Sequence, residues 1–392
     1  MKEKIVNLIA NHVEGMTAEE IATFIEIPPK QELGDYAFPC FRLAKTMHKA
    51  PNLIAADIKE AIGDIDFLDK IDVQGAYLNF FVKKNIFVQT MIESALKDNF
   101  GGSDEGADKV ICIDYSSPNV AKNFHVGHLR TTIIGNSLYK IYSKLGYKVI
   151  RINHLGDWGT QFGKLIVAYK NWGTKEAVEK DGVAELMRLY VKFHEEADQN
   201  PELVDEARAW FSKMEHGDEE ALSIWQWFKD ISLVEYKRTY DLLGMDFDYY
   251  LGESFYRDKC QEVVDQLTNA NLLKESEGAM IVDLSDYDMA PCIVTKKDGS
   301  SIYATRDLAA IFYRKNTYHF TKCLYVTGQE QKLHFAQVFK VVELLGNDWA
   351  KDSLVHIPYG LVSLEGAKLS TRSGNIIYAE DILHDAIKKS FE

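Results

Sequence analysis

The sequence predicts an α/β protein: a small α+β module followed by a parallel sheet built in two halves, with a helical insertion between the halves. Two observations support this prediction. Short apolar runs alternate with helical patterns after residue 108 and again near the C-terminal end, and strand–helix–strand units of this kind place their strands parallel in one sheet. Between these two regions a long stretch has helical periodicity.

The composition is ordinary for a globular protein of two or three domains, with 392 residues of which 46% are hydrophobic. No run of 18 apolar residues occurs, and Met1–Ile5 begins an amphipathic pattern, so we expect neither a membrane span nor a signal peptide. The five cysteines are widely spaced without a Cys-x-x-Cys pair, which is typical of reduced thiols in a cytoplasmic protein. The net charge of −14 argues against a nucleic-acid partner unless a local basic face offsets it.

Residues 1–108 form the predicted N-terminal module. Helical periodicity runs from Ile5 to Val13 and from Ala50 to Ile62, with a turn-rich stretch between them. Tyr77–Val82 alternates and is rich in β-formers, so we expect a strand there. The glycine-rich segment 99–106 is the predicted linker to the rest of the chain.

Residues 109–165 are the predicted first half of the parallel sheet. Val110–Ile113 is an apolar run, Thr131–Leu145 is helical and Val149–Ile152 is the next apolar run. Gly146 suits the end of the helix because glycine readily adopts the left-handed conformation found there. These segments make one βαβ unit.

Residues 166–290 are the predicted helical insertion, and residues 291–365 the second half. In the insertion an apolar stripe at i, i+3, i+4 and i+7 should be core: Leu186, Leu189, Tyr190 and Phe193. Later segments are strands Ala279–Leu284, Cys292–Val294, Cys323–Val326 and Leu354–Ile357, helices 306–316 and 331–345, and a hairpin turn at Asp298-Gly299. Residues 366–392 hold a glycine-flanked loop and the start of further helices.

The segment between the first strand and the first helix carries His125-Val126-Gly127-His128. A loop that enters a helix N-terminus is an anion site, since backbone N–H groups and the helix dipole both favour negative charge. Two histidines at i and i+3 are often surface or core residues, or two ligands of a metal; zinc would need a third ligand, and none is visible beside this pair. The position after a strand favours a nucleotide site, so we predict no protein-bound metal.

Several strings along the chain resemble those of the arginyl-tRNA synthetases of class I. Class I synthetases carry a His-x-Gly-His motif and a Lys-Met-Ser-Lys-Ser loop, which residues 125–128 and 368–372 resemble. The arginyl subtype is indicated by longer strings: Ser116-Ser117-Pro118-Asn119, residues 153–163, Tyr303-Ala304-Thr305-Arg306-Asp307 and, in the N-terminal module, Gly34-Asp35-Tyr36-Ala37.

The resemblance implies a Rossmann-like catalytic domain and a ligase that attaches L-arginine to tRNA(Arg) through an arginyl adenylate. ATP with Mg²⁺ would be a substrate, and no prosthetic group is expected. We also expect a cytoplasmic protein and a monomer. The family continues into a helical anticodon-binding domain, and because this sequence ends at Glu392 we expect the chain to lack that domain.

The candidate catalytic residues are His125, His128, Lys368 and Lys122. The histidines would hold the α-phosphate and adenosine, and Lys368 would neutralise the leaving pyrophosphate. The loop has Thr371 and Arg372 where the motif has its second lysine, and the resemblance implies that Lys122 compensates; the alternative for either lysine is an ordinary surface position. The expected ATP contacts are His125, Gly127, His128, Lys368 and Ser370.

Arginine recognition requires carboxylates that match a planar guanidinium. Asp307 is the first choice, four residues after Tyr303; the alternative role for Asp307 is a helix N-cap. The resemblance implies the remaining arginine contacts: Asp114, Ser117, Asn119, His128, Tyr303 and Gln331. Asn79 resembles a residue that touches the outer corner of tRNA, although an asparagine beside aromatics in a strand is as often structural.

Two alternatives to the synthetase stay open at this point. A nucleotidyltransferase that acts on a small metabolite would also use His-x-Gly-His, but it would not need the arginyl strings. A non-catalytic fragment that binds arginine, ATP or tRNA would fit the expected lack of the anticodon-binding domain. The presence of His125, His128, Lys368 and Asp307 favours the enzyme.

Overall fold

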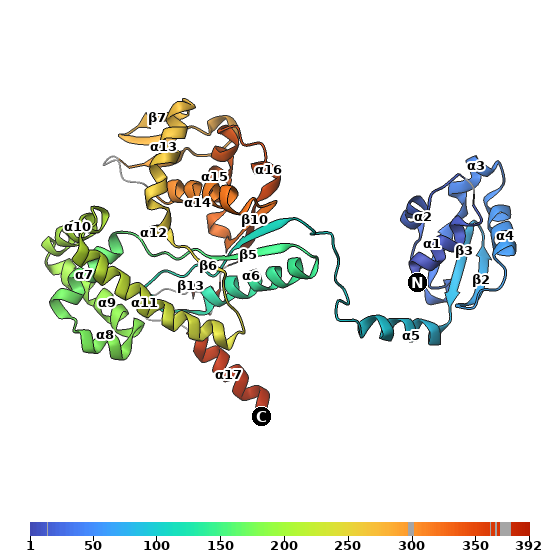
Figure 1. Ribbon diagram of the computed structural model, residues 1–392, viewed down its shortest axis with the longest axis horizontal. Coiled ribbons are helices and arrows are strands. Elements are labelled where there is room, and N and C mark those ends of the chain that lie inside the picture. The colour runs from blue at the N-terminus through green and yellow to red at the C-terminus, as the bar shows by residue number, and fades with distance from the viewer. Residues whose placement is uncertain (14, 297–301, 361, 365–366, 369–377) are drawn as a thin grey trace. The chain divides into compact units, whose positions relative to one another are not determined.

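The computed structural model describes residues 1–13, 15–296, 302–360, 362–364, 367–368 and 378–392 (Figure 1). The chain divides into two compact units, Met1–Gly101 and Gly102–Glu392. The predicted turn at Asp298-Gly299 lies outside the described residues.

The first unit packs helices against a three-stranded antiparallel sheet of order β1-β3-β2. Its elements are α1 (Lys2–Ala10), α2 (Ala18–Phe24), β1 (Tyr36–Pro39), α3 (Ala44–Met47), α4 (Pro51–Ile62), β2 (Leu68–Gln74), β3 (Tyr77–Val82) and α5 (Lys84–Ala95). The predicted strand at Tyr77–Val82 and the predicted helix ending at Ile62 are therefore confirmed.

Local signals set the helix ends of this unit. Thr17 and Glu20 form a reciprocal capping box that starts α2, which satisfies two backbone N–H groups that would otherwise lack partners. Pro51 occupies the first turn of α4, where its missing N–H costs nothing, and Gly63 ends the helix at φ +64°. The apolar faces of the helices in this unit pack on the sheet, and Ile5 and Ile54 from the helices and Phe80 from β3 are completely buried.

The second unit is built on a five-stranded parallel sheet of order β11-β10-β4-β5-β6. The strands are β4 (Val110–Asp114), β5 (Lys148–Asn153), β6 (Tyr249–Tyr250), β10 (Lys322–Gly328) and β11 (Leu354–Tyr359). Helix α6 (Val126–Lys144) connects β4 to β5, and α15 (Lys332–Leu344) connects β10 to β11. Both predicted βαβ units are thus present, and their first strands, β4 and β10, are neighbours in one sheet.

Both faces of this sheet are covered, which explains why its strands appear in the sequence as continuous apolar runs. Ile111, Ile113 and Leu324 point to the side that packs with α6 residues such as Leu129. The alternate residues Cys112 and Cys323 join the core formed with α14 (Tyr303–Tyr318) and α15. In Figure 1 α6 lies on one side of the sheet and α14 and α15 on the other.

The insertion differs from its prediction. A run of five successive helices ends at Leu242, and the chain then returns to the central sheet as β6. The five helices are α7 (Thr160–Trp172), α8 (Lys175–Asp181), α9 (Val183–Gln199), α10 (Glu202–Glu215) and α11 (Glu219–Leu242). The prediction missed β6 because two residues are too few for a periodic signal.

The remaining elements of the second unit frame the sheet and end the chain. They are α12 (Glu253–Tyr256), α13 (Cys260–Asn269), the antiparallel strands β7 (Leu273–Ser276), β8 (Ala279–Val282) and β9 (Cys292–Thr295), α16 (Ala350–Ser353), the pair β12 (Ser363–Leu364) and β13 (Ala367–Lys368), and α17 (Ala379–Phe391). The stripe residues Leu186, Leu189 and Phe193 are buried as predicted, and Tyr190 packs partly buried against the same core.

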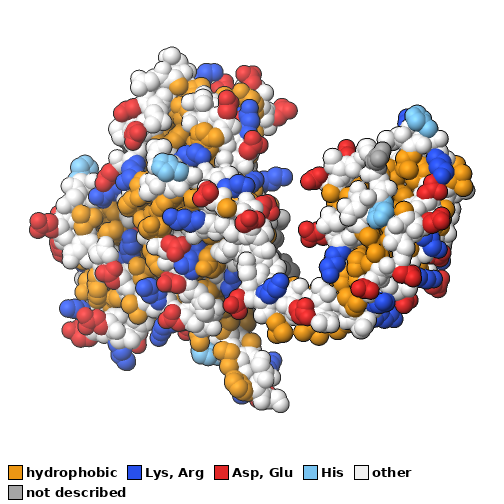
Figure 2. Space-filling view, turned by 45° about the vertical axis from the view of Figure 1, so that its right-hand side comes forward, with side chains coloured by type: hydrophobic (Ala, Val, Ile, Leu, Met, Phe, Trp, Pro, Cys, Tyr) orange, Lys and Arg blue, Asp and Glu red, His pale blue; other side chains and the backbone are white. Residues whose placement is uncertain are grey.

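The surface carries both signs of charge. On the face drawn in Figure 2, Lys and Arg side chains are interspersed with Asp and Glu. All five cysteines are buried and free of disulfides. Within the described ranges no helix is both long and apolar enough to cross a membrane.

Candidate active site

A cavity of about 480 Å³ in the second unit gathers six of the seven residues predicted to bind arginine. These are Asp114, Ser117, Asn119, Tyr303, Asp307 and Gln331. The lining also includes Gly156, Glu253, Arg306, Thr327, Glu330 and four aromatic or imidazole side chains, His154, Tyr325, His334 and Phe335. The seventh, His128, is not among the lining residues. The cavity lies at the carboxyl ends of β4 and β10, the edge of a parallel sheet where ligands bind.

The loop after β4 holds its polar side chains in a strained backbone. Ser116 and Ser117 have φ of +70° and +47°, and Ala121 has +60°. Such angles are uncommon for residues with a Cβ and cost on the order of 1 kcal/mol or more each. They persist because the loop is tied down: Ser117 Oγ donates to Asp114 Oδ1 at 2.9 Å, and the Ser117 N–H donates to Asn153 Oδ1 at 3.2 Å.

Asn119 lies against the start of the Gly156-Asp157 turn. The two backbones form a short bridge, in which the Gly156 N–H donates to the carbonyl of Pro118. A Cβ on Gly156 would lie 2.0 Å from Asn119 Oδ1, so only glycine leaves room for this amide. The glycine of the 153–163 string therefore serves to admit the Asn119 side chain at the cavity wall.

Asp307 lies inside α14, one turn after Tyr303, so the alternative that it caps the helix is wrong. Helix α14 begins at Tyr303, three residues before the start of the predicted helix 306–316, and its N-cap is Ile302. Asp307 Oδ2 accepts a hydrogen bond from His334 Nε2 at 2.6 Å. Among the described residues, no hydrogen bond to Oδ1 of Asp307 is present, which leaves that oxygen for a ligand.

Glu253 is a lining residue that the sequence analysis missed. It starts α12, directly after Gly252, and its carboxylate accepts from Arg306 Nη1 at 2.7 Å. Burial raises the pKa of Glu253 to about 8, although the nearby Arg306 acts in the opposite direction. A group with such a pKa in a cavity is a functional candidate, since a cationic ligand would favour its ionised form. No local motif marks it, because α12 reaches the cavity only through the return of the chain to β6.

His125 and His128 meet at the start of α6 with their rings stacked 3.8 Å apart. His125 is the N-cap: its Nδ1 accepts from the Gly127 N–H at 3.1 Å, and His128 Nδ1 accepts from the His125 N–H at 3.2 Å. Burial lowers the pKa of both rings, to about 3 for His128. Both imidazoles are therefore neutral at pH 7, and because Nδ1 is an acceptor in each, the proton of each ring is on Nε2.

This geometry limits how Gly127, a predicted ATP contact, could meet a ligand. Its backbone N–H is engaged by His125 and is not open to a ligand. A Cβ at Gly127 would lie 2.8 Å from the His125 ring, so the glycine makes room for that ring. The donors that this turn offers are thus the two Nε2–H groups.

Three further predicted residues are placed less fully. Lys122 lies in the same loop, where its Nζ is 6.0 Å from the centre of the Tyr190 ring, and its charge contributes to lowering the pKa of both histidines. Lys368 is in β13, which pairs with β12, but its side chain is not described, and Ser370 lies outside the described residues.

Asn79 lies in β3, in the middle of the sheet of the first unit. The residue is 3% exposed, which leaves little of it for contact with RNA, and the tRNA role stays a prediction. Among the described residues no group of three or more His, Cys, Asp or Glu side chains could hold a metal ion.

Two family models match the chain. Residues 91–392 match the model described as tRNA synthetases class I (R), catalytic domain, and residues 2–82 match the arginyl tRNA synthetase N terminal domain. Together they cover both compact units.

Proteins of known name agree with this match. The chain is 56% identical to "Arginine--tRNA ligase" of Alkaliphilus metalliredigens and to that of Clostridioides difficile, each over all of this chain and 69% of the relative. Among solved structures, arginyl-tRNA synthetase of Thermus thermophilus shares the fold at a TM-score of 0.71 and 20% identity, covering 99% of this chain and 70% of that one. The arginyl-tRNA synthetase structure from Plasmodium falciparum has a TM-score of 0.68 at 22% identity, and the match covers 99% of this chain and 67% of that one. The chain therefore belongs to the arginyl-tRNA synthetase family.

Proposed function

We propose that this chain attaches L-arginine to tRNA(Arg) in two steps, with ATP as the energy source and arginyl adenylate as the intermediate. The observation that carries the proposal is the cavity lined by carboxylates and amides from both halves of the sheet. Asp307 and Glu253 supply acceptors for a guanidinium at one end, and Ser117 and Asn119 supply polar groups at the other.

The substrate arginine is held at both ends in this proposal. Its guanidinium binds Oδ1 of Asp307 and the ionised Glu253 carboxylate, with Tyr303 and Gln331 beside it. Its α-amino group binds the Asn119 amide, with Ser117 and Asp114 next to it. A guanidinium presents several N–H donors in one plane, so two carboxylates on separate elements discriminate against the single ammonium of lysine.

ATP binds where α6 begins. The Nε2–H groups of His125 and His128 donate to the α-phosphate and its neighbourhood, and the positive end of the helix dipole supports the same charge. Lys368 and Ser370 are further proposed ATP contacts, and Gly127 is proposed to lie beside the nucleotide without donating its N–H, which His125 engages. Lys122 supplies a second cation. Mg²⁺ accompanies ATP as part of the substrate and binds chiefly to phosphate oxygens.

Catalysis then needs no nucleophile from the protein. The arginine carboxylate attacks the α-phosphate, the bond to the β-phosphate breaks, and pyrophosphate leaves as arginyl adenylate forms. A 2′-hydroxyl of the terminal adenosine of tRNA next attacks the arginyl carbonyl, and AMP leaves. Positioning and the prearranged donors lower the barrier, and losing one such donor costs about 3 kcal/mol. We also propose a cytoplasmic monomer.

Exchange of labelled pyrophosphate into ATP, measured with arginine and tRNA(Arg), tests the proposal. We expect exchange that depends on both, and none with lysine in place of arginine. A chain that binds arginine and ATP in a calorimeter but exchanges nothing would favour the non-catalytic fragment, and exchange driven by a different small metabolite would favour a nucleotidyltransferase. Asp205→Asn, an exposed carboxylate on α10, is the control variant and should retain exchange.

A further inference from the structure

Arg314 is a wholly buried cation beneath the cavity. It lies on α14, seven residues after Asp307, and therefore two turns further along nearly the same face of the helix. Its side chain is 0% exposed. A guanidinium is costly to bury unless it is paired and hydrogen-bonded, so the partners of Arg314 indicate why it is there.

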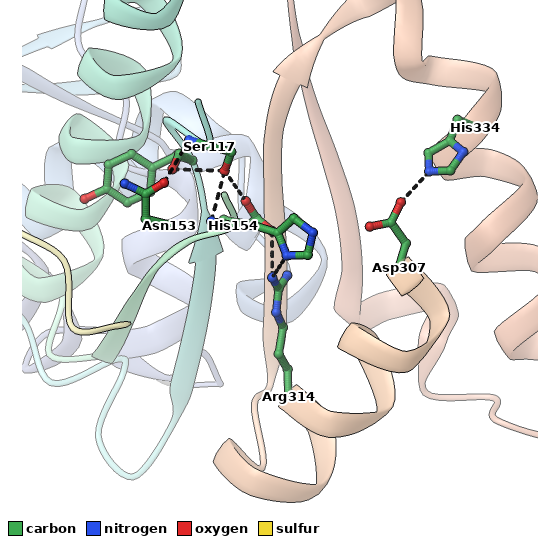
Figure 3. A network of polar contacts seen from close by, with 8 residues as sticks. Ser117, Asn153, His154, Asp307, Arg314 and His334 are labelled. Atoms are coloured by element: carbon green, nitrogen blue, oxygen red, sulfur yellow. Dashed lines mark hydrogen bonds and ion pairs between the residues drawn. The ribbon is translucent and has the colours of Figure 1, made fainter. Parts of the chain in front are cut away.

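The two partners of Arg314 come from the other half of the sheet. Its Nη2 forms an ion pair with Asp114 Oδ2 at 2.8 Å, at the end of β4, and donates to His154 Nδ1 at 3.2 Å, just after β5 (Figure 3). Since arginine is only a donor, His154 Nδ1 must accept, which places the proton of a neutral ring on Nε2. The His154 ring also stacks on Tyr256 at 5.4 Å.

The contact continues into the strained loop that lines the cavity. Asp114 is 6% exposed, and its second oxygen, Oδ1, accepts from Ser117 Oγ. That same hydroxyl oxygen accepts from the His154 N–H at 3.2 Å. Arg314 thus fixes two groups, Asp114 and His154, and both of them hold Ser117.

Stability alone is a poor reason for this arrangement. Within the described residues, Nε and Nη1 of Arg314 have no hydrogen-bond partner, nor do the buried hydroxyls of Tyr256 and Tyr325 whose rings lie 5.9 and 5.5 Å from the guanidinium. A buried ion pair whose donors are not all satisfied contributes little net stability, and apolar residues of similar size often do as well. A role in the site accounts for the cation better.

We propose that Arg314 is a positioning residue for the α-amino end of the substrate arginine, an inference that rests on the function proposed above. The guanidinium of Arg314 neutralises and orients Asp114 and orients His154, and together these hold Ser117 in its left-handed conformation beside Asn119. Asp307, on the same helix, points toward His334 and serves the guanidinium end. Helix α14 thereby contributes Asp307 as a direct contact to the guanidinium end of the substrate and Arg314 as the support for its α-amino end.

Arginine and 5-guanidinovalerate, which lacks the α-amino group, distinguish this role from a structural one. Calorimetry on the whole chain should show that Arg314→Met weakens arginine binding at least tenfold while 5-guanidinovalerate and ATP change less than threefold. Arg314→Lys keeps the charge and should lose less, with the same ligand pattern. In an Asp114→Asn background, Arg314→Met should add less than threefold, because both changes break one contact. Arg188→Met, on the exposed face of α9, is the matched control.

Two results would overturn the inference. One is arginine binding by Arg314→Met within threefold of the unsubstituted chain. The other is an equal loss for arginine, 5-guanidinovalerate and ATP, since that pattern means a general loss of structure. If the unsubstituted chain itself does not bind arginine, the proposed function has failed instead, so the two failures are distinguishable.

Discussion

Replacing Asp307 by asparagine removes a negative charge from the cavity and changes little else. The Asn side chain has the same shape, and its carbonyl oxygen can still accept the hydrogen bond from His334 Nε2 that Asp307 accepts at 2.6 Å. The side chain of Asp307 is 21% exposed, so its charge is partly but not fully screened by solvent. The variant therefore isolates the charge that the substrate guanidinium is expected to need.

The expected magnitude follows from this environment. Hydrogen bonds to charged groups contribute about 1.5–3 kcal/mol, and the half-buried position favours the middle of that range. A loss of about 2 kcal/mol corresponds to a roughly 30-fold weaker arginine complex. ATP binding should change less than about twofold, since the histidines at the start of α6 do not line this cavity.

Calorimetric titration with arginine and, separately, with ATP measures both values, with Asp205→Asn as the control. Arginine binding within threefold of the unsubstituted chain would show that Asp307 does not bind the guanidinium. Equal loss of arginine and ATP would show instead that Asp307 supports the fold. Lysine that binds as well as arginine to the unsubstituted chain would refute the pocket assignment as a whole.

Four further predictions concern charge and packing. The pKa of His128 is about 3 in the folded chain and 6.5 in the unfolded chain, so on acidification protons bind to the unfolded state first. The free energy of unfolding should therefore fall by roughly 1 kcal/mol from pH 7 to 5.5. Denaturant titration of His128→Gln should show a smaller fall over the same pH range. Because the pKa of Glu253 is about 8, arginine should bind more tightly as the pH rises from 6 to 8, by up to about tenfold per pH unit. Glu253→Gln should flatten this pH dependence of arginine binding in the same titration. An arginine affinity of the unsubstituted chain that does not change with pH would contradict the prediction. Lys122→Met should lower the rate of pyrophosphate exchange about tenfold or more while the arginine affinity stays unchanged. Lys140→Met, at an exposed position, is the control, and an unchanged exchange rate in Lys122→Met would contradict the prediction. Gly135→Ala should destabilise the chain by about 1–3 kcal/mol, measured by denaturant titration. The reason is that the alanine Cβ would lie 2.1 Å from the ring of the buried Tyr115. Ser137→Ala, at an exposed position on the same helix, is the control and should leave the stability unchanged.

The parallel sheet was predictable because its strands are buried on both faces. Val110–Ile113 and Cys323–Val326 are therefore continuous apolar runs that stand out against the helical patterns around them. Strand β6 was not predictable, since its two residues carry no period and its place in the sheet depends on pairing with Asn153 and Ile152.

The site was predictable where its residues belong to contiguous strings. Ser117, Asn119, Tyr303 and Asp307 all lie in such strings, and the cavity brings them together. Glu253 and Arg314 belong to no string: the first reaches the cavity through the chain reversal at β6, and the second through an ion pair with a distant strand end. Contacts of this kind arise from tertiary structure, and local patterns do not encode them.

The orientation of bound arginine would show which end of the substrate the Asp307 and Glu253 carboxylates hold. A crystal structure of the chain with arginine should place guanidinium nitrogens within about 3 Å of Asp307 Oδ1 and of Glu253, with the α-amino group at Asn119 and Ser117. Arginine bound in the reverse direction, or outside the cavity between the ends of β4 and β10, would contradict the account.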